Sequence, residues 1–307
     1  MELKYRDPRT ALVAWGQIDH HVADMTATFA ADVSLAAAQD ALAAHGQWLA
    51  VDGDPSGSLG DLVAGNSTGP LRLGYGAWRD LLLGVQFRNH ADELISAGGR
   101  AMKNVAGYDL TKLMIGQRGA FGEIVTITVR TYRRPVGAVL ARFASDARIL
   151  PRLLPTPARP QWAMLTSDAL FCGYLGDEQT LAFYTRDLEE HRPHDLAPRP
   201  LSDDLTQRRT MWRTPAEQAS FRASVPPTRV LEFAKAISPR AWVADAAFGI
   251  VLGSYEGAED AALIKQSADA AGGSVTLFDP TGLITDSPAT PAAQQLIARL
   301  VAAFDRK

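Results

Sequence analysis

The sequence contains one cysteine, Cys172, among its 307 residues. A single thiol cannot form an internal disulfide, and it cannot supply a four-cysteine zinc or iron–sulfur site. It fits a protein of a reducing compartment. Cys172 lies between Phe171 and Gly173 in an apolar segment, which favours a buried thiol over a nucleophile.

The chain also lacks an apolar run that approaches the roughly 18 residues of a membrane span. Residues 1–10 are charged and contain no apolar signal core. Lysine and arginine number 31 against 34 acidic residues, and this net charge of −3 gives no electrostatic footprint for nucleic acid. These absences predict a cytoplasmic protein, for which attachment to a membrane could come only through partners.

Metal ligands and catalytic bases are sparse as well. Among the six histidines, His191 and His194 are a candidate ligand pair, but they flank a proline in a polar stretch that favours a surface loop. His90 falls in a predicted hairpin turn and is expected to be solvated. Arg222 is a candidate to face a carboxylate, with an ion-paired or solvent-facing arginine as the alternative. The sequence therefore predicts no metal site and leaves the catalytic residues unknown.

The first part of the chain has the pattern of strands joined by turns and short helices. Residues 25–33 have strand composition, and Ser34 is placed to cap a helix that ends at Gly46. Apolar residues at Leu35, Ala38 and Leu42 would form one face of this helix. Further strands are predicted at 80–87, 94–97 and 123–132, with a hairpin turn at 88–93.

The character of the sequence changes after Pro135. Residues 152–160 hold three prolines and are typical of an exposed loop, and the charged, proline-rich residues 191–218 are expected to contribute little to a core. The predicted strands span 161–166, 169–175, 221–225 and 242–252, and the predicted helices span 177–190, 228–237 and 292–304, with a last helix and strand pair within 258–278. The β-α-β-β-α-β order favours a ferredoxin-like layer.

One segment, Gly99 to Leu110, has the pattern of a strand that turns tightly into a short helix. Its glycines allow the backbone to approach another group closely. Lys103, Asn104 and Asp109 add polar groups that an ordinary core turn does not need. Taken alone, the segment is equally consistent with a loop between packed elements.

The glycine-rich section at 56–70 gives the strongest support for a functional role of the segment from Gly99 to Leu110. Consecutive backbone N–H groups from Ser58 to Gly60 predict a concave nest for an anion such as a pyrophosphate. Asn66 offers both a donor and an acceptor. Asp61 adds a negative charge that would oppose a pyrophosphate unless the carboxylate is turned away or paired.

With the segments at 74–85 and 116–126, these motifs resemble, in their order, the FAD-binding subunit of glycolate oxidase within the vanillyl-alcohol-oxidase (PCMH-type) flavoproteins. The resemblance covers about 25–135 and, more faintly, 221–278. It implies FAD as cofactor and hydride transfer from a 2-hydroxy acid such as glycolate. The cofactor-binding residues that it implies are Ser58, Leu59, Gly60, Gly65, Asn66, Gly69, Gly122, Ile124 and Val125, with Glu123 in the same strand backbone.

The resemblance also exposes a gap, because members of this family begin with a subdomain whose arginine–glycine loop grips the pyrophosphate. Before Met25 this sequence has a single glycine, Gly16. The expected architecture is thus α+β: a truncated PCMH-type FAD-binding domain at 1–135, limited to the second subdomain, and a ferredoxin-like α+β domain at 136–307.

Three interpretations remain open at this point. The first is the FAD-binding subunit of a glycolate oxidase-like 2-hydroxy-acid dehydrogenase complex, with a larger flavin subunit and an iron–sulfur subunit as partners. The second is a non-catalytic assembly subunit of that complex that has lost FAD. The third is a fragment that results from a wrongly assigned start codon.

Overall fold

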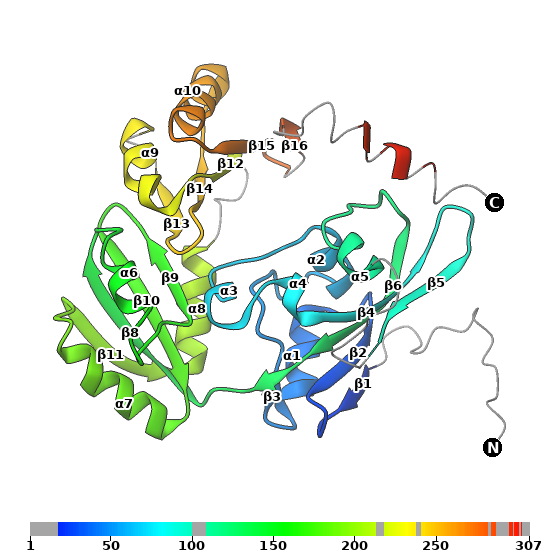
Figure 1. The fold of residues 1–307 in the computed structure, drawn as a ribbon, viewed down its shortest axis with the longest axis horizontal. Helices are drawn as coiled ribbons and strands as arrows, with labels where there is room; N and C mark the ends of the chain where they lie inside the picture. Colours follow the sequence, from blue (N-terminus) through cyan, green and yellow to red (C-terminus); the bar gives the residue numbers. More distant parts are fainter. Residues whose placement is uncertain are drawn as a thin grey trace. The chain divides into compact units, whose positions relative to one another are not determined.

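The computed structural model describes residues 18–99, 109–212, 218–237, 241–281, 284–286, 295–296, 298–300 and 302. These residues form two compact units (Figure 1). Unit 1 takes the described residues within Met1–Thr68, Tyr75–Arg134 and Thr290–Lys307, and unit 2 takes those within Gly69–Gly74 and Pro135–Ala289. Most of the polar motif between Gly99 and Leu110 lies outside the described residues, so its predicted role stays a prediction.

Unit 1 is built on a five-stranded antiparallel sheet in the order β1-β2-β6-β4-β5. The strands are β1 (Ile18–His21), β2 (Thr26–Ala30), β4 (Leu82–Arg88), β5 (Leu94–Gly98) and β6 (Glu123–Arg130), with β3 (Gln47–Trp48) and β7 (Tyr132–Arg133) as a separate pair. Its helices are α1 (Leu35–Ala43), α2 (Leu59–Ala64), α4 (Trp78–Leu81) and α5 (Leu110–Leu113). A further short helix, α3 (Arg72–Tyr75), lies where the chain passes through unit 2 and returns.

The two faces of this sheet differ in chemistry. Register places Phe29, Val85 and Ile127 on one face, where each is almost completely buried in the apolar core. On the other face the hydroxyls of Thr28 and Thr128 share a hydrogen bond of 2.8 Å between their oxygens. The strand predicted at 123–132 is therefore confirmed over Glu123–Arg130. Its side chains alternate between an apolar and a polar face, and the polar face is buried as well.

The predicted helix after Ser34 is confirmed in detail. The Ser34 hydroxyl accepts a hydrogen bond from the N–H of Ala37 at 3.2 Å, which satisfies one of the orphan donors at the helix start. Leu35, Ala38 and Leu42 are its buried residues, so the helix packs by the apolar face that the sequence spacing gives. The predicted hairpin is also confirmed, since β4 pairs with β5 across residues 89–93.

Unit 2 contains a nine-stranded sheet in the order β11-β8-β10-β9-β13-β14-β12-β15-β16. Its strands are β8 (Gly137–Ala144), β9 (Trp162–Leu165), β10 (Ala169–Gly176), β11 (Asp195–Pro200), β12 (Ser220–Ser224), β13 (Trp242–Asp245), β14 (Ile250–Ser254), β15 (Ser274–Phe278) and β16 (Ile284–Asp286). Its helices are α6 (Leu150–Leu153), α7 (Glu178–Glu189), α8 (Leu201–Met211), α9 (Val230–Ala236) and α10 (Gly257–Ala270), with a 3-10 turn η1 at Pro227–Arg229.

The β-α-β-β-α-β order occurs twice in this sheet. The first copy runs from β8 to β11 and the second from β12 to β15. In each copy the fourth strand lies beside the first, the first beside the third and the third beside the second. The two copies meet where β9 pairs with β13. The sequence predicts only one such layer, because β8 carries no alternating pattern and the turn before Gly249 splits the strand predicted at 242–252.

The expectation that residues 191–218 contribute little to a core is wrong for part of the segment. Both β11 and α8 lie within it, and α8 buries the side chains of Asp204 and Arg208. Arg208 Nη1 and Asp204 Oδ2 are 2.6 Å apart, and the indole N–H of Trp162 donates to Asp204 Oδ1 at 3.1 Å. Pairing within the helix and the contact from β9 together make burial of these charges tolerable.

The segment at 69–74 is held in unit 2 by polar contacts. Arg72 Nε donates to Asp245 Oδ2 at 2.9 Å, and its guanidinium lies 4.1 Å from the ring centre of Phe248. The N–H of Gly74 donates to the carbonyl of Gln161 at 2.9 Å. Burial raises the pKa of Asp245 to about 6, although Arg72 acts in the opposite direction. The ion pair between Arg72 and Asp245 therefore links the position of the segment at 69–74 to the charge of the Asp245 carboxyl group.

The structure also bears on the single cysteine and on the lack of long apolar runs. Cys172 is completely buried, and burial raises the pKa of its thiol, which fits a packing role and not a nucleophile. Among the described residues, no helix has the length and apolar character needed to cross a bilayer.

Candidate functional site

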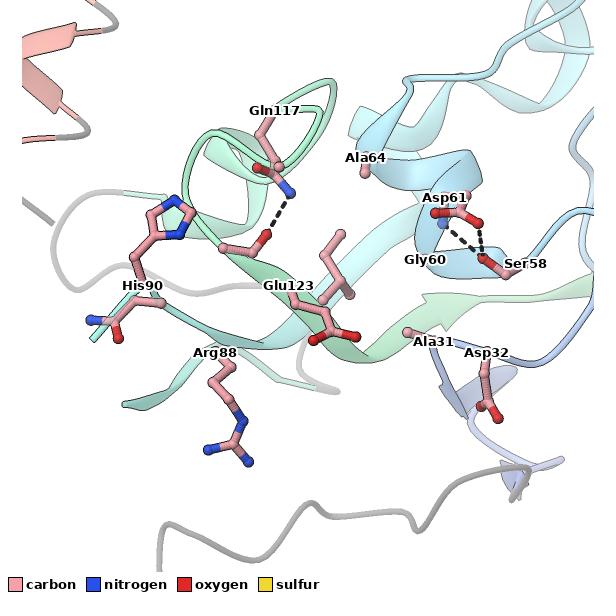
Figure 2. Close-up of a pocket in the computed structure, with 14 residues that line it drawn as sticks. Ala31, Asp32, Ser58, Gly60, Asp61, Ala64, Arg88, His90, Gln117 and Glu123 are labelled. Atoms are coloured by element: carbon pink, nitrogen blue, oxygen red, sulfur yellow. Dashed lines mark hydrogen bonds between the residues drawn. The ribbon is translucent and has the colours of Figure 1, made fainter. Parts of the chain in front are cut away.

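Unit 1 contains a pocket of about 730 Å³ (Figure 2). Four segments that are distant in sequence line it: the chain after β2, the first turns of α2, the hairpin after β4, and the loop that leads into β6. Small residues at Ala31, Gly60 and Ala64 form part of the lining, which leaves room for a ligand to approach the backbone.

The start of α2 carries a carboxylate of its own. Ser58 is the N-cap, and its hydroxyl accepts from the N–H of Asp61 at 3.1 Å and donates to Asp61 Oδ2 at 2.7 Å. An acidic group in the first turn is favourable because the helix dipole is positive at this end. The hydrogen bond to Asp61 Oδ2 comes from a neutral hydroxyl, so it leaves the negative charge of Asp61 beside the predicted phosphate site.

The prediction that the backbone N–H groups of Ser58 to Gly60 form a nest for an anion is wrong for two of these groups. The N–H of Leu59 donates to the carbonyl of Val33 at 2.9 Å, and that of Gly60 donates to the carbonyl of Ala31 at 2.8 Å. The chain after β2 runs beside this loop and takes both donors. A Cβ on Gly60 would lie 2.8 Å from Cβ of Ala31, so the glycine serves this close packing.

The loop before β6 is fixed by a buried amide side chain. Gln117 Nε2 donates to the carbonyl of Gly122 at 3.0 Å, and its Oε1 accepts from the N–H of Phe121 at 2.9 Å. Gly122 has a φ of +117°, and a Cβ there would lie 2.0 Å from the carbonyl oxygen of Arg88. Only glycine can hold this backbone against the end of β4, which places the first residues of β6 at the pocket.

Titratable side chains lie on different sides of the pocket. Figure 2 shows Arg88 and His90 on one side, Asp32 and Asp61 on the other, and Glu123 between them. Arg88 and Glu123 are partners in the β4–β6 register. The guanidinium of Arg88 nevertheless turns to the hairpin, where Nη1 donates to the carbonyl of Asp92 at 3.1 Å and lies 3.3 Å from its carboxylate.

The structure brings some of the sequence-predicted ligands together and separates others. Ser58, Gly60, Gly122 and Ile124 line the pocket. The other five do not line it. Leu59 is completely buried in α2, and Val125, which follows Ile124 in β6, is partly buried. Gly65 and Asn66 are exposed at the C-terminal end of α2, and Gly69 is buried in unit 2. The φ of Asn66 is +49°, a conformation that asparagine tolerates in turns. The cofactor role of all nine residues stays a prediction.

Sequence reasoning gave no role to Arg88 or Gln117, and it treated His90 as a solvated turn residue. His90 lines the pocket, with Nε2 3.3 Å from the carbonyl oxygen of Ala120. The predicted hairpin is the sequence feature that could have pointed to these residues, because its register with β6 places the end of β4 beside the glycine-spaced loop.

The other histidine candidates have ordinary surroundings. His21 Nε2 lies 3.0 Å from Asp19 Oδ1, and His20 Nε2 lies 3.0 Å from Gln47 Oε1. Within the ranges that the structure describes, no group of three histidine, cysteine or acidic side chains is arranged to hold a metal ion. Arg222 lies on β12 in unit 2 and is partly buried.

Comparison with known families and proteins gives a consistent result. Residues 12–98 match the family model described as FAD binding domain. Glycolate oxidase subunit GlcE of Escherichia coli is 32% identical over 130 residues, which are 41% of this chain and 37% of that protein. The mitochondrial D-lactate dehydrogenase [cytochrome] of Arabidopsis thaliana is 31% identical over 121 residues, 39% of this chain and 21% of that protein.

Among solved structures, an alkyldihydroxyacetonephosphate synthase has a TM-score of 0.67 with 14% sequence identity, and the match covers 95% of this chain and 65% of that one. This likeness concerns the fold alone. The chain spans between a fifth and two fifths of the length of the two curated relatives. The resemblance to PCMH-type FAD-binding flavoproteins is confirmed for the matched segment, and so are FAD and oxidoreductase chemistry as the properties of the proteins that it resembles.

Proposed function

We propose that the chain is the FAD-binding subunit of a glycolate oxidase-like 2-hydroxy-acid dehydrogenase complex, and that the pocket of unit 1 forms part of its flavin site. One observation carries the proposal. The pocket is lined by the same segments, around Ser58 and around Gly122, that contain the flavin-type motifs. The matched family and the glycolate oxidase relative support the same assignment.

The residues of the pocket fit FAD in size and in chemistry. The small side chains at Ala31, Gly60 and Ala64 allow a flat ring or a sugar chain to lie close to the backbone. Arg88 lies on one side of the pocket, and its guanidinium would offer positive charge to a phosphate if it left Asp92 on the hairpin. When bound, FAD would supply the acceptor for the hydride of the hydroxy acid, and this chain would hold and orient it.

The proposal extends to the second unit and to the partners. We take residues 1–135 and 136–307 as two domains, although the compact units exchange 69–74 and the described residues after 290 between them. We take the second as ferredoxin-like, because each half of its sheet has the fourth-first-third-second strand order. A larger flavin subunit and an iron–sulfur subunit are the proposed partners, since a relative is a glycolate oxidase subunit. Because this chain has a single, buried cysteine, the iron–sulfur cluster would be bound by the iron–sulfur subunit. Attachment to a membrane would come through these partners.

The second candidate is a non-catalytic assembly subunit that has lost FAD. It is favoured by the engaged amides of Leu59 and Gly60 and by the carboxylate of Asp61 at the predicted phosphate site. These features remove donors and add a negative charge where a pyrophosphate needs the opposite.

Purification with and without co-expressed partner subunits separates the two candidates. The cofactor proposal predicts a yellow protein with flavin absorbance near one equivalent, and bleaching of that absorbance when glycolate or D-lactate is added without oxygen. A colourless chain that takes up no FAD alone or in the complex would support the assembly role. The chain and complex must be compared at equal salt, because charge contacts to phosphate are screened.

Removal of the Asp61 charge is expected to tighten the binding of FAD. Asp61→Asn removes a charge from the pocket while an amide oxygen remains to accept from the hydroxyl of Ser58. We expect the dissociation constant of FAD to fall about two- to fivefold, since repulsion between solvated charges is modest. Titration of flavin fluorescence measures this change, and weaker binding by the variant would show that Asp61 helps to hold the cofactor.

A further inference from the structure

Glu123 has an unusual position in the pocket. It is the first residue of β6, its side chain is exposed, and it lines the pocket between the basic and acidic sides (Figure 2). Its cross-strand partner is Arg88, but that guanidinium is taken by Asp92. Among the described residues, the Glu123 carboxylate makes no hydrogen bond or ion pair.

The backbone that carries this carboxylate is held rigidly. Gln117 bonds to the N–H of Phe121 and the carbonyl of Gly122 at the end of the turn that precedes Glu123. The close approach of Gly122 to the carbonyl of Arg88 fixes the first residue of the strand. A ligand-binding group is effective when its neighbours hold it in place before the ligand arrives. Glu123 meets this condition, although no residue that the structure describes is its partner.

The chemistry of an ionised carboxylate limits what it can bind. It accepts hydrogen bonds through two oxygens and donates none, and it repels phosphate. Two adjacent hydroxyls match its two oxygens, and dinucleotide-binding folds use an acidic residue on ribose hydroxyls in this way. FAD carries such vicinal diols on its ribose and on its ribityl chain.

We infer that Glu123 is a positioning residue that accepts hydrogen bonds from a vicinal diol of the bound dinucleotide, on the ribose or on the ribityl chain. The inference rests on the proposed function, because it needs the dinucleotide in this pocket. It gives the two carboxylates opposite effects: Asp61 weakens binding by repulsion, and Glu123 strengthens it by accepting hydrogen bonds.

The test compares the affinity of FAD for the full chain with that for Glu123→Gln, measured by fluorescence titration. The variant has nearly the same shape and an exposed position, so equal thermal unfolding of the two proteins is expected. Hydrogen bonds to a charged group are the stronger ones, and we expect the dissociation constant to rise about tenfold. Asp61→Asn removes the same charge from the same pocket and is expected to act in the opposite direction. Glu259→Gln, on α10 of unit 2, is expected to change nothing.

Two smaller ligands identify the diol. Weaker binding of adenosine diphosphate by Glu123→Gln, together with loss of preference over its 2′-deoxy form, assigns the ribose. Weaker binding of FMN without that loss assigns the ribityl chain. Unchanged or tighter binding of FAD by Glu123→Gln overturns the inference and leaves the proposed function intact, since the carboxylate would then only repel phosphate. A wild-type chain and complex that bind no FAD overturn both.

Discussion

Gly122→Ala is expected to destabilise unit 1 by about 3 kcal/mol or more and to lower FAD affinity more than tenfold. The glycine has a φ of +117°, outside the conformations that L side chains adopt readily, and such strain costs about 1–3 kcal/mol. Its new Cβ would also lie 2.0 Å from the carbonyl oxygen of Arg88, so the loop must move away from β4. That movement displaces the anchor of Gln117 and the first residues of β6, which line the pocket.

Gly119→Ala is the matched control for this variant. Gly119 lies in the same loop and lines the same pocket with a φ of +84°, but a Cβ there would have nothing within 4 Å. It carries the backbone strain without the collision, so we expect a loss of only about 1 kcal/mol. Urea unfolding and flavin titration of both variants measure the difference. Equal midpoints and equal affinities would show that the contact between Gly122 and Arg88 does not fix the loop.

Arg72→Met is expected to destabilise unit 2 by about 3–5 kcal/mol at pH 8. The variant keeps an unbranched apolar side chain, but it removes the guanidinium that lies over Phe248 and leaves the carboxylate of Asp245, whose side chain is 1% exposed, without its cation. Removing one partner of a buried pair costs this much because the other charge stays buried and uncompensated. Urea unfolding followed by tryptophan fluorescence, compared at pH 8 and pH 5, measures the loss.

The pH dependence has a definite sign. The pKa of Asp245 is raised to about 6, with burial as the largest cause. The folded state thus binds this proton more tightly than the unfolded chain, and the stabilisation is complete below the ordinary pKa of about 3.9 and lost as pH rises through 6. Since Arg72 lowers this pKa, the variant should raise it further, and its cost should shrink at pH 5, where the carboxyl is neutral.

A second substitution separates charge from packing. Arg72→Met combined with Asp245→Asn removes both charges, so most of the stability lost at pH 8 should return. If Arg72→Met is equally destabilising at pH 5 and pH 8, or if the double variant recovers nothing, the ion pair is not what holds the segment at 69–74.

Local sequence signals predicted the elements that depend on local physics. The helix α1 has a capping serine and an apolar face of Leu35, Ala38 and Leu42, and both features act within the helix itself. The strand β6 and the hairpin before it follow from alternation and turn residues. These elements form the frame of unit 1 and were all predictable.

Elements that depend on distant partners could not be predicted in this way. Asp204 and Arg208 are four residues apart and have the pattern of an exposed helical pair, but a contact from Trp162 places them in the core. One miss has a local cause instead: residues 78–81 form α4, where a strand was predicted to begin at Asp80. The Asp80 carboxylate accepts from the N–H of Ala77, three residues earlier, at 2.9 Å and holds a helical turn.

The candidate site shows the same division. Glycines at Gly60 and Gly122 marked the right segments, since both permit close backbone contacts that a Cβ would prevent. The use of those contacts was not visible: the amide of Gly60 donates to Ala31, nearly thirty residues earlier in the chain. Register between β4 and β6 likewise decides that Arg88 and Glu123 share the pocket. Spacing along the chain therefore indicated two segments that line the pocket, whereas tertiary pairing determines which groups face it.

Hydrogen–deuterium exchange with and without FAD tests the central claim most directly, because it reports where on the chain the cofactor binds. The account predicts slower exchange on addition of FAD in the first turn of α2, in the hairpin after β4 and in the loop at 117–123, with unit 2 unchanged. Protection confined to unit 2, or bound FAD with no protection in these three segments, would contradict it.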